Sequence, residues 1–310
     1  MRVLFIGTGE IGVPTLRLLQ KASEHQLVGV VTQPDKPVGR AQKIQSPPIK
    51  SILTSSDLPI LQPPRIKDAA AIAQIRQLDP EVIVVMAYGQ ILPRDVLQIP
   101  PIACLNLHAS LLPRWRGAAP IQAAIASGDR KTGITVMYMA EGLDTGDILL
   151  QRKLEIAPTD TGGSLHDRLA EIAPQALAEA LRLLSAKTAL RIAQDNALAS
   201  HAPKLHREAG RIDWLEPAAV IERSIRAFNP WPGSFTSVTT KTSGSRKLKI
   251  FSAALVDAKG EPGAIIDPAA GRFVIATGDG ALSLQEVQLE GKQRMSAAEF
   301  VRGNREVALV

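Results

Sequence analysis

The chain has little of what would cross-link it covalently or anchor it in a membrane. Its 310 residues include a single cysteine, Cys104, which excludes an intramolecular disulfide framework and a four-cysteine zinc site. No run of about 18 apolar residues occurs, so we expect no transmembrane helix. The first residues lack the apolar core and small-residue cleavage site of a signal peptide. We therefore expect a protein of the reducing cytoplasm, long enough for two domains.

The excess of positive charge is modest. Thirty-six lysines and arginines stand against 30 acidic residues, giving a net charge of +6 and a pI near 9.5. This balance permits a polyanionic partner such as a nucleic acid, but it is also common on ordinary solvated surfaces. Charge alone therefore does not identify a partner.

Residues 1–189 alternate β-branched runs with amphipathic helical patterns. This alternation is typical of a Rossmann-like α/β domain, a mostly parallel sheet with helices on both faces. The predicted strands are Arg2–Ile6, Leu27–Thr32, Val82–Met86, Ala103–Leu107, Gly133–Met139 and Ile148–Leu154. The predicted helices are Val13–Ala22, Lys67–Gln77, Pro120–Ser127 and Ser164–Ser185. We expect this part to be the catalytic domain.

A polar, proline-containing stretch over residues 190–208 breaks the pattern and is predicted to be a linker. One helix is expected after it, over Glu216–Phe228. Short alternating runs separated by glycine and aspartate turns then predict a small, OB-like β-barrel domain over residues 209–310. Its predicted strands are Phe235–Val238, Lys247–Phe251, Gly263–Ile266, Phe273–Ala276 and Leu282–Gln288.

A glycine motif follows the first predicted strand and opens a helix. Residues 7–12, GTGEIG, formally match the dinucleotide-binding pattern. The next strand ends at Thr32, however, and Gln33 and Pro34 occupy the place where an acid that binds ribose is expected. We favour a tight strand-to-helix turn, and a dinucleotide-binding protein acting through Gly7 to Gly12 stays as an alternative.

The most informative chemical pattern lies at the end of the predicted strand Ala103–Leu107. Asn106 and His108 are two residues apart, so on a strand they face the same side. The later turn of residues 141–147 offers Asp144 as a partner for the histidine. Acyl transfer to an amine requires three groups: an amide that donates to an oxyanion, an imidazole that moves protons, and a carboxylate that orients the imidazole. The alternative is a strand end and a turn with purely structural side chains.

Two other reaction classes find no support in this region. No Gly-x-Ser-x-Gly elbow surrounds Ser110, which argues against a serine hydrolase. His108 has no second histidine or cysteine at ligand spacing, which argues against a metal site.

Residues 33–50 are predicted to form a long, proline-rich and basic loop. It carries Lys36, Arg40, Lys43 and Lys50 against one acid, Asp35. Long loops in compact domains are more often functional than idle, and cations of this kind bind phosphates in a salt-dependent way. The alternative is a solvated insertion.

Residues 106–122, NLHASLLPRWRGAAPIQ, and residues 142–147, GLDTGD, resemble the core of the methionyl-tRNA formyltransferase family. The resemblance covers nearly the whole chain and includes residues 33–40, 87–93, 211–214 and 225–233. It implies a 10-formyltetrahydrofolate-dependent enzyme that formylates the α-amino group of methionyl initiator tRNA for translation initiation. The formyl donor would be a co-substrate, and neither a metal nor a nicotinamide is implied.

The resemblance also implies roles for individual residues. Asn106 would donate to the formyl oxyanion, His108 would shuttle protons, and Asp144 would orient His108. The implied folate-binding residues are Met86, Ala87, Tyr88, Gly89, Ser110, Leu111, Leu112 and Pro113. The implied tRNA-binding residues are Lys36, Arg40, Lys43, Arg114, Arg116, Arg246, Lys247 and Lys249.

Other formyltransferases that use the same donor share the Asn/His/Asp set, so an enzyme that acts on a small amine stays as an alternative. That alternative predicts no function for the barrel or for the basic loop. A non-catalytic RNA-binding protein is a third possibility. With no self-complementary apolar stripe evident, we expect a cytoplasmic monomer that binds folate and initiator methionyl-tRNA and has no membrane partner.

Overall fold

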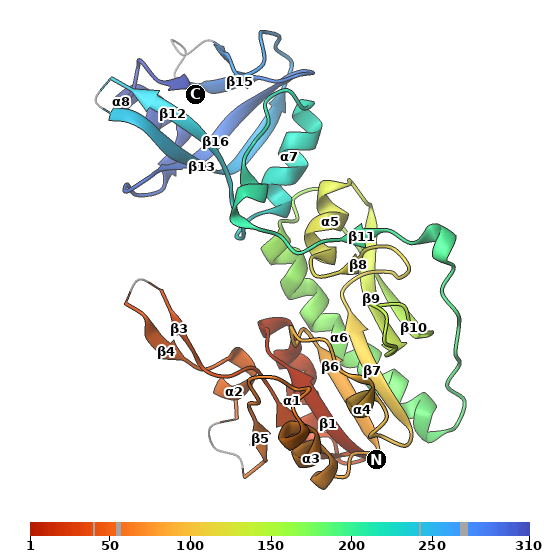
Figure 1. Ribbon diagram of the computed structural model, residues 1–310. Coiled ribbons are helices and arrows are strands. Elements are labelled where there is room, and N and C mark those ends of the chain that lie inside the picture. Colours follow the sequence, from red (N-terminus) through yellow and green to blue (C-terminus); the bar gives the residue numbers. More distant parts are fainter. Residues whose placement is uncertain (40, 54–56, 242, 267–271) are drawn as a thin grey trace. The chain divides into compact units, whose positions relative to one another are not determined.

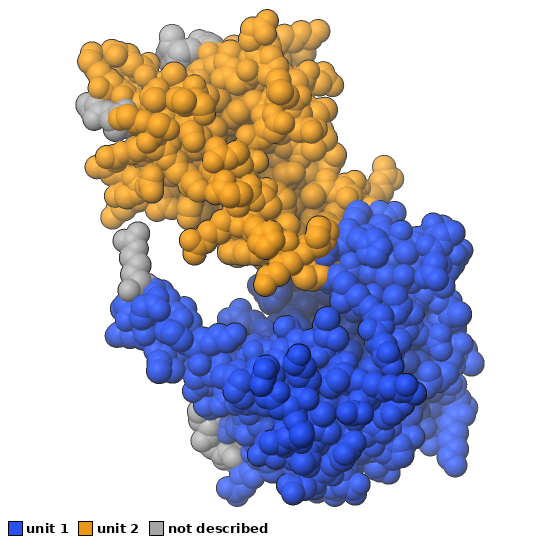
Figure 2. Space-filling model, in the orientation of Figure 1, with its two compact units in different colours: residues 1–117, 131–155, 166–202 blue, residues 118–130, 156–165, 203–310 orange. Residues whose placement is uncertain are grey.

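The computed structural model describes residues 1–39, 41–53, 57–241, 243–266 and 272–310. The chain divides into two compact units, coloured blue and orange in Figure 2. The first unit comprises residues 1–117, 131–155 and 166–202, and the second comprises residues 118–130, 156–165 and 203–310. Residues 191–202 of the predicted linker therefore pack with the first unit. The domain boundaries 1–189, 190–208 and 209–310 stay a prediction.

The first unit is built on a sheet whose strands follow the order β10-β9-β7-β6-β1-β2-β5 (Figure 1). These strands are β1 (Arg2–Gly7), β2 (Gln26–Val31), β5 (Ile60–Leu61), β6 (Val82–Met86), β7 (Ala103–His108), β9 (Lys131–Tyr138) and β10 (Ile148–Glu155). The five strands from β7 to β5 in this path run parallel, whereas β9 is antiparallel to β7 and β10 is antiparallel to β9. The predicted, mostly parallel sheet is confirmed.

Helices cover both faces of this sheet because its central strands are apolar on both faces. On β1, Leu4 and Ile6 share one buried cluster with Ile75 of the third helix. Phe5 is fully buried and faces the other side, where a Cβ at Gly12 would lie 3.2 Å from its ring. The helices are α1 (Val13–Lys21), α2 (Pro48–Ser51), α3 (Ala69–Gln77), α4 (Arg94–Leu97) and α6 (Gly162–Ser185). No helix in the described ranges is long and apolar enough to cross a membrane.

The glycine motif forms the tight turn between β1 and a short 3-10 helix, Glu10–Gly12. A Cβ at Gly7 would lie only 2.8 Å from the carbonyl oxygen of Met86, so β1 and β6 approach closely there. Asp35, the acid that follows the second strand, already accepts hydrogen bonds from Lys50 and Gln62. These contacts support the interpretation of the motif as scaffold.

The basic stretch of residues 33–50 contains regular structure that the sequence did not predict. Strands β3 (Lys36–Val38) and β4 (Lys43–Gln45) form a hairpin in which Pro37 pairs with Ile44. The expectation of a loop was wrong here because all six strand residues are exposed and show no apolar alternation. Figure 1 shows the hairpin extending away from the sheet of the first unit.

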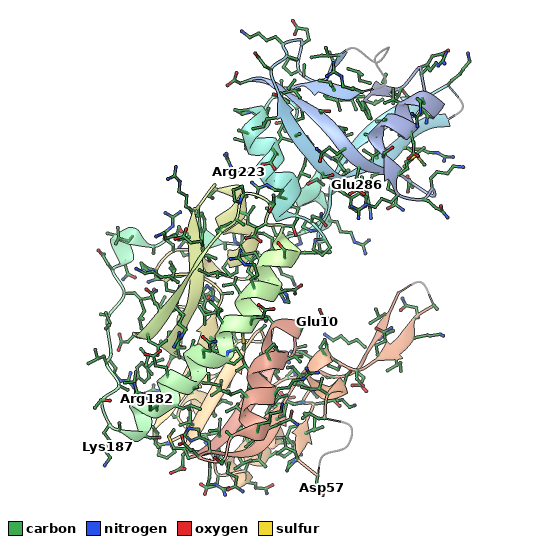
Figure 3. All side chains as sticks on the ribbon, turned by 180° about the vertical axis from the view of Figure 1, so that it is seen from behind. Glu10, Asp57, Arg182, Lys187, Arg223 and Glu286 are labelled. Atoms are coloured by element: carbon green, nitrogen blue, oxygen red, sulfur yellow. The ribbon has the colours of Figure 1, made fainter. Side chains whose placement is uncertain are left out.

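A 3-10 helix and a short strand occupy the segment that follows α6. Arg182 and Lys187 mark the carboxyl end of that helix in Figure 3. Beyond it, β11 (His201–Ala202) pairs in parallel with β8 (Arg116–Gly117), and residues 196–198 form a 3-10 helix. The segment is therefore fixed to the first unit by hydrogen bonds and is not a free connection.

The second unit contains a nearly closed antiparallel barrel with the strand order β14-β15-β16-β13-β12-β18. Its strands are β12 (Ser234–Thr240), β13 (Ser243–Val256), β14 (Ile265–Ile266), β15 (Phe273–Ala276), β16 (Ala281–Leu289), β17 (Met295–Ser296) and β18 (Ala308–Leu309). Its helices are α5 (Pro120–Ala126), α7 (Ala218–Ala227) and α8 (Ala297–Gly303). Arg223 on α7 and Glu286 on β16 are labelled in Figure 3.

The barrel forms because inward-facing apolar residues on its strands pack against α7 and α8. Phe273 and Phe300 stack in this core with ring centroids 5.7 Å apart. The predicted barrel is confirmed, although β13 is longer than the predicted strand Lys247–Phe251, and α8 was not predicted.

Candidate active site

Asn106 and His108 lie at the carboxyl end of β7, between β6 and β9 in the sheet. In register, Asn106 is opposite Val85 of β6 and Met137 of β9. His108 is buried and Asn106 is half-buried. Among the described residues, the Asn106 carboxamide has no hydrogen-bond partner. Open α/β sheets bind ligands at this edge, so the free amide is well placed to meet one.

His108 is held between a backbone carbonyl and a carboxylate. Its Nε2 atom lies 2.8 Å from the carbonyl oxygen of Trp115, and its Nδ1 atom lies 3.6 Å from Oδ2 of Asp144. The two side chains are only 7% and 12% exposed. Trp115 has a positive φ of 62°, which turns the backbone at that residue. The structure therefore brings His108 and Asp144 together, as the sequence predicted.

Asp144 lies in a tight turn that is fixed from two sides. The backbone N–H of Gly117 donates to its Oδ2 atom over 2.8 Å. The side-chain amide of Gln194 donates to the carbonyl oxygens of Asp144, at 2.9 Å, and Gly146, at 2.7 Å. Asp144 has a φ of 51°, a conformation that residues other than glycine rarely adopt. The turn thus depends on outside contacts to keep its shape.

Both nitrogens of the His108 ring face hydrogen-bond acceptors. A neutral imidazole donates from one nitrogen only, whereas an imidazolium donates from both. The Trp115 carbonyl and the Asp144 carboxylate are therefore both satisfied once the ring has taken up a proton. A group with this arrangement can act as a base whose charged form is stabilised in place.

The loop after His108 is fixed by a polar network. Ser110 is fully buried, and its hydroxyl donates to the carbonyl oxygen of Arg114. Thr135 on β9 donates to the carbonyl oxygen of Ser110 and accepts from the N–H of Leu112. Gln151 on β10 donates to the carbonyl oxygen of Leu112. The Ser110 hydroxyl is therefore engaged inside the loop, and the loop has one well-defined shape.

A second turn follows β6 at the same edge of the sheet. Ala87 and Gly89 have φ values of 50° and 86° and are exposed. Between them, the carbonyl oxygen of Tyr88 accepts hydrogen bonds from Thr8 and Gln33. Burial raises the pKa of Tyr88 to about 12. Of the predicted folate residues, Met86, Tyr88, Ser110 and Leu112 are buried, Leu111 and Pro113 are half-buried, and Ala87 and Gly89 are exposed.

A hollow of about 670 Å³ lies at the opposite edge of the sheet, beside the amino ends of β1 and β2. Met1, Arg2 and His25 are among the residues that line it. Burial and the neighbouring N-terminal ammonium lower the pKa of His25. None of the predicted site residues lines this hollow, so its size does not make it the candidate active site.

The predicted tRNA-binding residues of the first unit differ in exposure. Lys36 and Lys43 are exposed and lie on the same face of the β3–β4 hairpin. Arg40 lies outside the described residues. Arg114 is exposed, with its guanidinium 5.2 Å from the centre of the Trp115 ring. Arg116 is buried, so it is not a surface cation.

The guanidinium of Arg116 is occupied by side chains of the same unit. It donates two hydrogen bonds to Oε1 of Gln194, at 3.1 and 2.8 Å, and one to Oδ1 of Asn196, at 2.9 Å. Burial and three hydrogen bonds suit this residue to a structural task.

The predicted tRNA-binding residues of the second unit lie on β13. Arg246 and Lys249 are exposed. Lys247 is half-buried, with its Nζ atom 3.6 Å from the centre of the Phe235 ring and 3.9 Å from Glu208. The side chains of Lys247 and Lys249 point to the outer face of the barrel, since Leu248 between them is buried in its core.

Sequence reasoning missed four residues that shape the site: Thr8, Thr135, Gln151 and Gln194. Each of them contacts backbone groups far away in the sequence, at separations between 23 and 80 residues. No motif signals such a contact, because a threonine or glutamine that binds a carbonyl needs no particular neighbours.

An amide, an imidazole and a carboxylate lie at the carboxyl edge of a Rossmann-like sheet, and a small barrel follows. This combination belongs to an enzyme that transfers a group. The chain belongs to the formyl transferase family: the family model described as formyl transferase matches residues 1–181, and the formyl transferase C-terminal domain model matches residues 204–305.

Relatives are similar over nearly their whole length. The chain is 45% identical over 306 residues to the methionyl-tRNA formyltransferase of Akkermansia muciniphila, covering 98% of this chain and 97% of that protein. It is 43% identical to the methionyl-tRNA formyltransferase of Geobacter sulfurreducens, covering 98% of this chain and 94% of that protein. The family resemblance inferred from the sequence motifs is confirmed.

Solved structures share the fold. The sugar 3N-formyl transferase WlaRD, crystallised in the presence of dTDP and 5-N-formyl-THF, matches with a TM-score of 0.67 at 17% identity, covering 94% of this chain and 99% of that chain. The methionyl-tRNA formyltransferase from Clostridium thermocellum matches with a TM-score of 0.58 at 19% identity, covering 83% and 94%. HypX from Aquifex aeolicus, in complex with tetrahydrofolic acid, matches with a TM-score of 0.63 at 18% identity, covering 97% and 47%.

Proposed function

We propose that this protein transfers the formyl group of 10-formyltetrahydrofolate to the α-amino group of methionyl initiator tRNA. The product, N-formylmethionyl-tRNA, serves translation initiation in the cytoplasm. The observation that carries the proposal is the 45% identity to a methionyl-tRNA formyltransferase over 98% of the chain. The geometry around His108 supports the chemistry.

Three residues would carry out the transfer. The Asn106 amide, which has no partner among the described residues, would donate to the oxyanion that forms on the formyl group. His108 would take the proton that the attacking amine loses and return it to the leaving nitrogen, which requires its Nε2 atom to turn from the Trp115 carbonyl toward the substrate. Asp144, 3.6 Å from the ring, would stabilise the imidazolium between these two steps. All three come from one chain, in line with the expected monomer.

The folate would bind beside these residues. It supplies an activated formyl group when bound. The half-buried apolar side chains of Leu111 and Pro113 suit the flat face of a pterin, and the exposed backbone at Ala87 and Gly89 suits its polar edge. Met86, Tyr88, Ser110 and Leu112 are buried and would shape the pocket from behind.

The tRNA would meet cations of both units. In the first unit these are the exposed Lys36, Lys43 and Arg114, together with Arg40, which is proposed from the sequence alone; in the second unit they are Arg246, Lys247 and Lys249 on β13. We propose the first unit as catalytic and the barrel as a tRNA-binding part, in keeping with the domains 1–189 and 209–310. Binding through these cations would weaken as salt rises, since it releases counterions from the phosphate backbone.

The proposal is tested by supplying the purified protein with methionyl-tRNA in the presence and absence of 10-formyltetrahydrofolate. We expect formylation only when both are present, and we expect His108→Ala to lose turnover while it keeps tRNA binding. His166→Ala is the matched control, because His166 also contacts an aspartate, Asp167 at 2.9 Å, but at a half-buried position on α6. Preference for a free amino sugar over methionyl-tRNA would overturn the substrate, and a normal rate for His108→Ala would overturn the mechanism.

A further inference from the structure

Residues 191–202, called the strap below, bind the two loops that hold His108. On one side, Ile192 forms a two-way backbone bridge with Ile148, next to the turn that contains Asp144. On the other side, the Ser200 hydroxyl accepts from the N–H of Trp115, and the Ser200 carbonyl oxygen accepts from the N–H of Arg116. The strap therefore contacts both loops, although the sequence suggested only a linker.

Gln194 is the strap residue whose side chain joins these two loops. Its amide nitrogen donates to the carbonyl oxygens of Asp144 and Gly146, and its Oε1 atom accepts two hydrogen bonds from Arg116. Both donors and the acceptor are thus used. The orientation of the amide follows from these partners, since carbonyl oxygens accept and a guanidinium only donates.

The turn that Gln194 binds needs this support. Asp144 has a φ of 51°, which is unfavourable for a residue with a side chain. A Cβ at Gly146 would lie 1.8 Å from the carbonyl oxygen of Tyr138, so the turn closes tightly on β9. The backbone at Asp144 sets where its carboxylate lies relative to His108. A contact that holds this backbone therefore also sets the distance between the two side chains.

We propose that Gln194 is a positioning residue for the transfer reaction: it keeps the Asp144 carboxylate beside His108, and Arg116 holds Gln194 in place. Gln194 itself touches neither His108 nor the reacting atoms. This proposal rests on the roles given above to Asp144 and His108. It assigns the buried cation Arg116 to the catalytic centre rather than to the tRNA.

Gln194→Glu tests the contact of Gln194 with the Asp144 turn separately from its contact with Arg116. The glutamate keeps an acceptor for Arg116 and gains an ion pair with it, but it loses both N–H donors and faces two carbonyl oxygens. We expect kcat to fall by about 10- to 100-fold, because small displacements of catalytic groups have effects of this size. KM for both substrates should stay within about twofold. The melting temperature should fall moderately, because two carbonyl oxygens lose their donors while the anchor to Arg116 is kept.

The matched control is Asp195→Asn, the reverse exchange on the neighbouring residue. The Asp195 side chain only accepts from the N–H of Ala197, and an asparagine can accept in the same way. We expect unchanged kcat for this variant. A fall in kcat as large as that of Gln194→Glu would overturn the proposal, since it would mean that any change in the strap has the same effect.

A double mutant distinguishes this proposal from the proposed function. If Gln194 acts through Asp144, then Gln194→Glu adds no further loss of kcat in an Asp144→Asn background. A further loss of tenfold, or a kcat within threefold of wild type for Gln194→Glu alone, overturns the positioning role while the proposed function stands. A near-normal rate for Asp144→Asn overturns the proposed mechanism instead.

Discussion

Replacing Asp144 with asparagine removes a charge from the centre of the site while keeping its shape. An asparagine can still accept the hydrogen bond from Gly117, now 2.8 Å from Oδ2, and it is the same size as aspartate. The backbone contacts from Gln194 to the turn are unaffected. We therefore expect Asp144→Asn to fold normally and to bind both substrates.

The expected loss of rate follows from the distance between the two side chains. Two opposite unit charges 3.6 Å apart attract by about 4 to 5 kcal/mol at an effective dielectric constant of about 20. This attraction is present when His108 carries the proton and absent in the neutral ground state. Since about 1.4 kcal/mol corresponds to a factor of ten, the loss of this attraction should lower kcat by about 10³-fold.

The assay is the initial rate of methionyl-tRNA formylation at saturating 10-formyltetrahydrofolate, with kcat and KM determined separately. Asp147→Asn is the control, because Asp147 lies in the same turn but pairs with Arg191, at 3.7 Å, rather than with His108. We expect that control to stay within about threefold of wild type. A loss below about tenfold for Asp144→Asn would refute the reasoning, since the carboxylate would then not act on a charged His108.

Three further predictions concern buried or paired groups. Burial raises the pKa of Cys104 to about 12. Iodoacetamide near pH 8 should therefore label this thiol only after unfolding. Rapid labelling of the native protein, detected by mass spectrometry, would contradict this. The hydroxyl of Tyr88 is buried with no partner in the described part of the chain. Tyr88→Phe should therefore leave the free energy of unfolding in urea unchanged or raise it by about 1 kcal/mol. A clear decrease would contradict this. Hydrogen bonds from Gln62 and then Lys50 lower the pKa of Asp35 below its ordinary value of 3.8. The ionised Asp35 therefore stabilises the fold above pH 3.8, and this stabilisation is lost as the pH falls below that value. The difference in urea midpoint between wild type and Asp35→Asn should therefore shrink between about pH 6 and pH 3, and a constant difference would count against the pairing.

The sheet and the placement of Asn106 and His108 at a strand end could be predicted because they depend on local pattern. Buried parallel strands are apolar runs, and β6 and β7 were predicted to within a residue for this reason. Asn106 and His108 then follow from the alternation of side chains along a strand. The turn of residues 141–147 offered Asp144 as the partner of His108, and the structure puts its carboxylate 3.6 Å from the imidazole.

The supporting contacts could not be predicted because they depend on distant backbone. Arg116 is charged and follows an exposed arginine, so its sequence context suggests a surface cation, whereas its guanidinium is buried against the strap. Gln194 lies in a polar stretch with no apolar period, and its partners are carbonyl oxygens about 50 residues earlier. The β3–β4 hairpin was missed because its six strand residues are all exposed.

Two of the contacts around His108 and Asp144 are made by main-chain atoms: the carbonyl of Trp115 and the N–H of Gly117. Apart from proline at residue 117, which has no N–H, a substitution at these two positions changes a side chain but leaves the contacting atoms present. Selection at residues 115 and 117 therefore acts on the path of the backbone rather than on side-chain chemistry. Gly117 shows how narrow that path is, because it has a φ of 120° and any Cβ would lie 2.5 Å from the carbonyl oxygen of Ala202. Sequence change at residue 117 is thus limited by backbone geometry, because glycine is the one residue that fits there without moving the strap.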